Sequence, residues 1–135
     1  MRSRLAISAA ILIQATVWAG CGAKTHHLTI AQVKSCLVNA GFRVRGEGRP
    51  GAGSALAVRT PEKTGYAFAV VALFDTEHEA TAYKQRFTQV LEKTPNPDTD
   101  YLKTLLQRRE RLVYGWTTRP TPADVRKLEG CTQTR

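Results

Sequence analysis

The stretch YAFAVVALF, residues 66–74, decides the fold of this 135-residue chain. It is the longest run of apolar and aromatic residues outside the N-terminal segment, and such residues favour an extended strand. Because apolar side chains would point to both sides of this strand, both of its faces need cover. The stretch therefore predicts a central strand in a sheet.

Two shorter strands are expected before it. Residues 42–45 alternate apolar and basic side chains, and residues 55–60 alternate again. The glycine-rich segment 46–54 reads as a loop, and PEKTG, residues 61–65, reads as a turn. These segments predict a meander of three antiparallel strands.

Two capping boxes mark the starts of helices. Thr29 with Gln32, and Thr76 with Glu79, each match the pattern in which two side chains satisfy backbone N–H groups of a first helical turn. Apolar residues follow both boxes at helical spacing, and the second helix should run to about Lys93.

The rest of the chain predicts one more strand and one more helix. TPNPDTD, residues 94–100, ends the second helix, and residues 101–107 form at most a further helical turn or two. RLVYGWT, residues 111–117, reads as a strand. Thr121 caps a last helix that ends near Cys131.

The resulting order is α-β-β-β-α-β-α, an α+β pattern in one small domain over residues 29–135. We expect a mostly antiparallel sheet with the helices packed on one face. Since the second helix returns the chain, the last strand should run parallel to the first and third strands. It should pair with one of them at a sheet edge, through a right-handed crossover.

The N-terminal segment has the features of an export signal. Arg2 and Arg4 precede an apolar, uncharged stretch over residues 5–20, and small residues follow. That stretch is shorter than the roughly 20 residues of a spanning helix. We expect residues 1–20 to be a signal peptide; a buried N-terminal helix is the alternative.

The stretch VWAGC, residues 17–21, resembles a bacterial lipobox, although Trp18 stands where leucine is commonest. The resemblance implies that Cys21 is acylated and becomes the new N-terminus, which would leave residues 21–28 as a tether. Ordinary secretory cleavage after Ala23 is the alternative.

The number of cysteines agrees with either route. Acylation or removal of Cys21 leaves Cys36 and Cys131 as an even pair in an oxidising compartment, whereas cleavage after Ala19 would leave an odd thiol. We predict a disulfide between Cys36 and Cys131, on the first and last helices.

The chain is strongly basic. Without residues 1–20 it holds 18 Lys and Arg against 11 Asp and Glu, a net charge of +7. If the last strand neighbours the first, basic residues could merge into a patch that binds lipid headgroups or an anionic polymer in preference to nucleic acid; a solvated basic face is the alternative. The candidate residues are Arg43, Arg45, Arg49, Lys103, Arg108, Arg109 and Arg111.

Aromatic residues suggest an apolar binding face. On the central strand Tyr66, Phe68 and Phe74 should point the same way, and so should the aromatics of the last strand. Helices on one side of the sheet would leave the other side uncovered. That face would dock a partner, a second copy or an apolar ligand, unless the aromatics pack under the helices. The candidates are Tyr66, Phe68, Phe74, Tyr114 and Trp116.

Catalytic and metal-binding patterns are weak. His26 and His27 lack further ligands at metal-site spacing, and we expect no metal and no cofactor. An enzyme would need a site assembled from scattered residues such as Asp75, His78 and Tyr114. Our leading hypothesis is a lipid-anchored, non-enzymatic binding module of the cell envelope. A small exported enzyme and a purely structural envelope protein are the alternatives.

Overall fold

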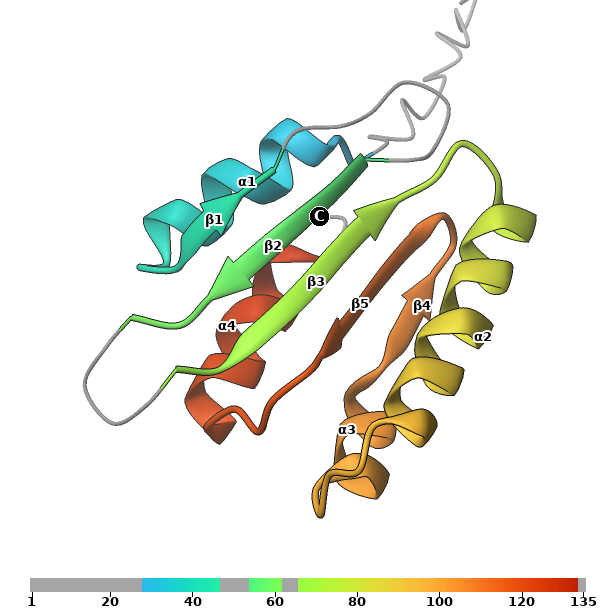
Figure 1. Ribbon diagram of the computed structural model, residues 1–135. Coiled ribbons are helices and arrows are strands. Elements are labelled where there is room, and N and C mark those ends of the chain that lie inside the picture. The colour runs from blue at the N-terminus through green and yellow to red at the C-terminus, as the bar shows by residue number, and fades with distance from the viewer. Residues whose placement is uncertain (1–27, 47–53, 62–65, 134–135) are drawn as a thin grey trace, which may run out of the picture.

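The central strand predicted from residues 66–74 is β3 (Phe68–Leu73), the middle strand of a five-stranded sheet (Figure 1). The computed structural model describes residues 28–46, 54–61 and 66–133. The other elements are α1 (Ile30–Asn39), β1 (Arg43–Arg45), β2 (Ser54–Arg59), α2 (Glu77–Lys93), α3 (Thr99–Leu105), β4 (Gln107–Arg109), β5 (Leu112–Trp116) and α4 (Pro122–Cys131).

The sheet has the strand order β1-β2-β3-β5-β4, and every neighbouring pair is antiparallel. The meander β1-β2-β3 and the pairing of the last strand with β3 agree with the expectation from the sequence. The α+β class and the antiparallel sheet are confirmed.

The direction of the last strand differs from the prediction. Strand β4 was not predicted from the sequence; it forms a hairpin with β5 through a turn at Glu110 and Arg111. Glu110 adopts a φ of 50°, as such a tight turn requires. The hairpin reverses the chain once more, so β5 runs antiparallel to β3 and lies inside the sheet. Strand β4, and not the last strand β5, forms this edge of the sheet.

The predicted caps are present at all three of the predicted helix starts. Thr29 accepts a hydrogen bond from the backbone N–H of Gln32, whose side chain accepts one from the backbone of Thr29, and Thr76 and Glu79 repeat this arrangement. Thr121 caps α4 by accepting a hydrogen bond from the backbone N–H of Asp124, and its hydroxyl donates to the Asp124 carboxylate. At the end of α1, a glycine at position 41 adopts a φ of +93°, a conformation that other residues rarely take.

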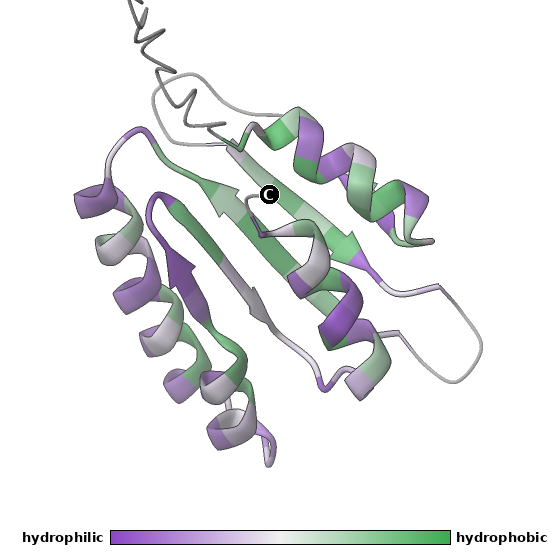
Figure 2. Cartoon of the chain, turned by 180° about the vertical axis from the view of Figure 1, so that it is seen from behind, coloured by the Kyte–Doolittle hydropathy of each residue, from purple (hydrophilic) through white to green (hydrophobic). Residues whose placement is uncertain are grey.

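Helices α1 and α4 cover one face of the sheet. Figure 2, a view from behind, shows both helices in front of the strands. Buried residues of α1, α4 and alternate positions of the strands form the main core on this side. They include Val33, Leu37, Leu56, Val58, Val71, Leu112, Tyr114, Trp116 and Leu128. This core explains why α1 and α4 share one side of the sheet. The expectation that the helices all pack on one face is wrong for α2, because the apolar side chains on the other face of β3 and β5 also need cover.

The two predicted disulfide cysteines join these helices. The sulfur atoms of Cys36 and Cys131 lie 2.07 Å apart, and their Cα atoms are 5.5 Å apart. The pair links α1 to α4 across 95 residues of sequence.

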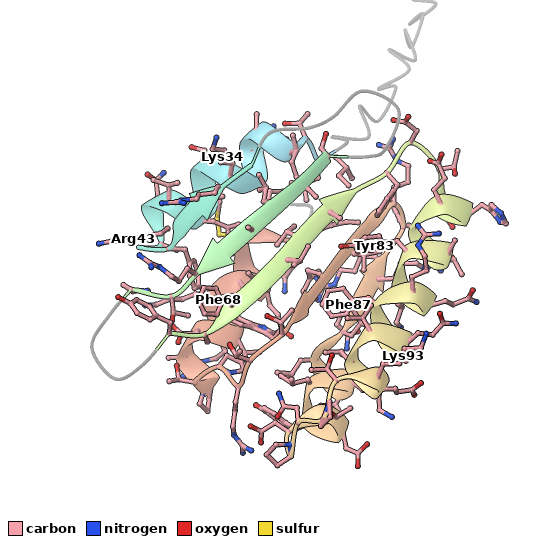
Figure 3. The ribbon with its side chains drawn as sticks, viewed as in Figure 1. Lys34, Arg43, Phe68, Tyr83, Phe87 and Lys93 are labelled. Atoms are coloured by element: carbon pink, nitrogen blue, oxygen red, sulfur yellow. A yellow bond between two sulfur atoms is a disulfide. The ribbon has the colours of Figure 1, made fainter. Side chains whose placement is uncertain are left out.

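Helix α2 packs on the opposite face, over β4 and β5. A smaller core there joins Phe74 and Val113 to Tyr83 and Phe87 of α2. Gly115 permits this contact, because a Cβ atom at that position would lie 2.8 Å from a Leu106 methyl carbon. The side chains of α2 reach across the hairpin, and none of the described helices covers the other half of this face (Figure 3).

Candidate binding surface

The uncovered half of the sheet is formed by β1, β2 and the start of β3. Successive side chains of a strand point to opposite faces of the sheet, so the residues between the main-core positions point to this side, away from α1 and α4. We call this surface the open face. Its residues are Arg43, Arg45, Ala57, Arg59, Phe68 and Val70.

Strand register places these side chains in two rows. Arg43 pairs with Arg59, which pairs with Phe68, so the first row is basic, basic and aromatic. In the second row Arg45 pairs with Ala57, which pairs with Val70. Paired residues on one sheet face have Cβ atoms about 4.5–5.5 Å apart, so Arg43 and Arg59 are close neighbours of like charge.

Aromatic rings extend the first row. The guanidinium carbon of Arg59 lies 4.4 Å from the ring centroid of Tyr66, a cation–π contact. The rings of Tyr66 and Phe68 lie 6.3 Å apart. Both aromatics are unusually accessible, with 39% of Tyr66 and 43% of Phe68 exposed. An arginine and two aromatic rings thus form one continuous exposed strip.

The charge around the open face is unbalanced. Within the described residues from Leu28 to Phe74 there is no Asp or Glu. Arg43 and Arg45 make no ion pair with any residue that the structure describes. Arg43 and Phe68 both lie on the side of the molecule away from α2 (Figure 3). Among the described residues, no carboxylate neutralises Arg43 or Arg45 of the open face.

The predicted basic patch is divided between the two edges of the sheet. Arg43 and Arg45 lie on β1, whereas Arg108 and Arg109 lie on β4, at the other edge. The condition for a merged patch, that the last strand neighbours the first, is not met, because β2 and β3 separate β1 from β5.

The basic residues near β4 are engaged locally. Arg108 pairs with Glu77 at 3.6 Å, and Arg109 lies over the ring of Tyr114. Arg111 donates a hydrogen bond to the Asp75 carbonyl oxygen at 3.4 Å. Lys103 contacts Glu92 and Asp100, and these carboxylates raise the pKa of its amine. Arg49 lies outside the described residues.

The five aromatic candidates do not share one face. In the pairing of β3 with β5, Ala69 faces Trp116 and Val71 faces Tyr114. Even-numbered residues of β3 therefore lie on the opposite side of the sheet from Tyr114 and Trp116, which are buried in the main core. Phe74 is buried under α2, with its ring 5.0 Å from that of Tyr83. Tyr66 and Phe68 alone belong to the exposed surface.

Tyr114 is a buried polar residue of the main core. Its hydroxyl has no hydrogen bond to the residues that the structure describes, and burial raises the pKa of this phenol. The Thr132 hydroxyl nearby donates to the Glu129 carbonyl oxygen. Tyr114 is only 1% exposed, so it offers no surface for catalysis.

The residues suggested for an enzyme are not brought together. His78 is exposed in the first turn of α2, and Asp75 is exposed before that helix. Tyr114 lies on the sheet face opposite α2. Among residues 28–46, 54–61 and 66–133, no group of three or more His, Cys, Asp or Glu could hold a metal ion.

A hollow of about 360 Å³ lies at the end of the sheet, where β5 leads into α4. Its polar side chains are used within the fold. The Thr60 hydroxyl accepts a hydrogen bond from the Ala67 backbone, and the Thr118 hydroxyl accepts one from Phe68. Arg119 pairs with Asp98 at 2.8 Å. These two threonine hydrogen bonds therefore fix the start of β3 beside the hollow.

Comparison with protein-family models, curated proteins and solved structures gave no match. In the part of the chain that the structure describes, no helix is both long and apolar enough to span a membrane. Cys21, His26 and His27 lie outside that part. The open face is thus the most distinctive surface of the described fold. Arg43, Arg45 and Phe68 were predicted from the sequence, whereas Arg59 was not, although its place in the alternating segment 55–60 was a signal.

Proposed function

We propose that this protein is an exported, lipid-anchored binding module of the cell envelope, and that the open face is its binding surface. The signal-like residues 1–20 and the lipobox-like VWAGC support export and acylation of Cys21. The pairing of Cys36 with Cys131 fits an oxidising compartment, where structural disulfides persist.

The observation that carries a binding role is the exposure of the first row of the open face. Phe68 remains 43% exposed next to Arg59, although β3 is the central strand of the sheet. An isolated domain gains nothing from leaving an aromatic ring and opposed arginines uncovered. A partner that covers them would bury the rings and neutralise the charge.

A binding role also fits the chemistry of the described surface better than catalysis does. Catalytic sites bring acids, bases or nucleophiles together in a concave pocket. In the described part of this chain, the candidates His78 and Tyr114 lie on different sides of the fold, and the polar groups lining the hollow are internally hydrogen-bonded. We therefore favour a non-enzymatic module.

The intact mass of the mature protein extracted from bacterial membranes tests export and anchoring. We expect loss of residues 1–20, addition of acyl groups on Cys21, and loss of the two thiol hydrogens of Cys36 and Cys131. Cys21→Ala, as a control, should remain unprocessed and unacylated. A mature protein with a free Cys21 thiol would contradict the proposal.

A further inference from the structure

The arginine charges of the open face indicate a negatively charged partner. Arg43 and Arg59 stand opposite each other, and like charges in this position oppose each other. Arg45 lies two residues along the same strand and face, and no described residue forms an ion pair with Arg43 or Arg45. An anion laid over these side chains would relieve their mutual repulsion.

The shape of the open face favours a broad partner. Ala57 occupies its centre, between Arg45 and Val70, so no large side chain forms a wall there. Small ligands are held in concave sites lined on several sides. The open face is instead a broad, shallow surface that α2 borders on the same side of the sheet, over β4 and β5, so it suits an extended partner that approaches from the β1 edge.

The neighbouring aromatics narrow the chemistry further. Tyr66 and Phe68 are exposed beside Arg59, so apolar rings and positive charge form one strip. This combination suits the boundary of a lipid bilayer, where arginines meet anionic headgroups and rings enter the region between headgroups and acyl chains. An acidic polymer would satisfy the arginines and leave the rings in water.

We propose that the open face lies against an anionic phospholipid bilayer. This inference rests on the proposed lipid anchor, which would hold the domain close to the membrane. The seven residue-to-residue steps from Cys21 to Leu28 span at most about 25 Å when fully extended. Such a short tether makes contact with the membrane effectively intramolecular, so weak surface contacts suffice to orient the domain.

Vesicle co-sedimentation of the unlipidated chain tests the proposal apart from the anchor. The chain from residue 21 onward retains the whole described fold, and Cys21→Ser prevents acylation. We expect this chain to bind vesicles of 70% phosphatidylcholine and 30% phosphatidylglycerol, and to bind pure phosphatidylcholine at least tenfold more weakly. Raising the salt concentration should weaken binding to the anionic vesicles, because salt screens exposed charges.

The decisive variant replaces Arg43, Arg45 and Arg59 by Gln. Each basic residue near an anionic surface contributes about fivefold in affinity, so the triple variant should lose about 100-fold. Phe68→Ser should weaken vesicle binding severalfold, and this loss of affinity should persist at high salt. Unchanged fluorescence of Trp116, which is buried beneath the opposite face, would show that the variants fold.

The matched control replaces Lys34, Arg126 and Lys127 by Gln. It removes the same charge from sites on α1 and α4. Both helices cover the other face of the sheet (Figure 2). We expect the control to keep its affinity within about threefold, because these charges would lie farther from the membrane than a Debye length of about 10 Å.

Three results would overturn the proposal. One is equal loss of affinity in both triple variants, which would mean that net charge alone drives adsorption. A second result is equal affinity for neutral and anionic vesicles, or a lack of binding to both kinds of vesicle. The third is arginine-dependent binding of soluble polyglutamate without vesicle binding, which would identify an acidic polymer as the partner. None of these results depends on Cys21, whereas a free Cys21 thiol in the mature protein would contradict the anchor.

Discussion

Removal of the Cys36–Cys131 bridge should destabilise the fold strongly. The bridge closes a loop of 95 residues, from α1 to α4. In the chain-entropy description, closing a loop of this length lowers the entropy of the unfolded chain by an amount worth about 4.7 kcal/mol at 25 °C. The free energy of unfolding of small domains is only about 5–15 kcal/mol. The variant with both cysteines changed to Ala should therefore be close to unfolding at 37 °C.

Urea unfolding provides the measurement. Trp116 is fully buried, and it is the only tryptophan once residues 1–20 are removed, so its fluorescence reports unfolding of the domain. We expect the double variant to lose about 4–5 kcal/mol of unfolding free energy. Reduction of the wild-type protein should reproduce this loss within about 1 kcal/mol, because both treatments open the same loop.

A small loss would refute this reasoning. If the double variant and the reduced protein unfold within about 1 kcal/mol of the oxidised protein, the bridge does not restrict the unfolded chain as loop closure requires. Ser35→Ala, on the exposed side of α1, is the matched control and should change the unfolding free energy by less than about 0.5 kcal/mol.

Three further predictions concern the sheet. Arg43→Thr should raise the unfolding free energy by several tenths of a kcal/mol, measured by urea titration, because it removes the repulsion with Arg59 and places a β-branched residue in a strand; a loss of stability would contradict the account of opposed charges. Burial raises the pKa of Tyr114 above its ordinary value of 10.0, so the unfolding free energy should fall as the pH rises above about 10, where the unfolded chain loses a proton that the folded chain retains. Tyr114→Phe should flatten this decline and cost less than about 1 kcal/mol at pH 7, since the hydroxyl lacks a hydrogen bond to the described residues; an unchanged alkaline slope would refute it. Gly115→Val should cost about 1–3 kcal/mol, because its Cβ would lie 2.8 Å from a carbon of Leu106, and Leu106→Ala in the same chain should recover part of the loss in thermal unfolding.

The sequence predicted those features that are set by local patterns. The run of apolar residues in β3 identified the central strand, and side-chain chemistry at Thr29, Thr76 and Thr121 identified three helix starts. The pairing of Cys36 with Cys131 followed from the number of cysteines and agrees with their positions. These signals are local or countable, so one sequence was enough to find them.

The missed features depend on contacts that are distant in sequence. Strand β4 has the sequence Gln-Arg-Arg and no apolar alternation, so its register with β5 is its only signal. The separation of the aromatics depends on Ala69 facing Trp116; a shift of one residue would have put Phe68 and Trp116 on the same face. Arg59 became a site residue only because β1 and β2 place Arg43 opposite it.

The most direct test of the central claim is arginine labelling on the membrane itself. Membranes that carry the full-length protein would be treated with phenylglyoxal, and labelling of Arg43, Arg45 and Arg59 would be compared with the same protein in nonionic detergent. Exposed Arg126 on α4 serves as the internal reference. We predict that the open-face arginines react several times more slowly on membranes while Arg126 is unchanged. Equal labelling in the two states would contradict a membrane-facing open face.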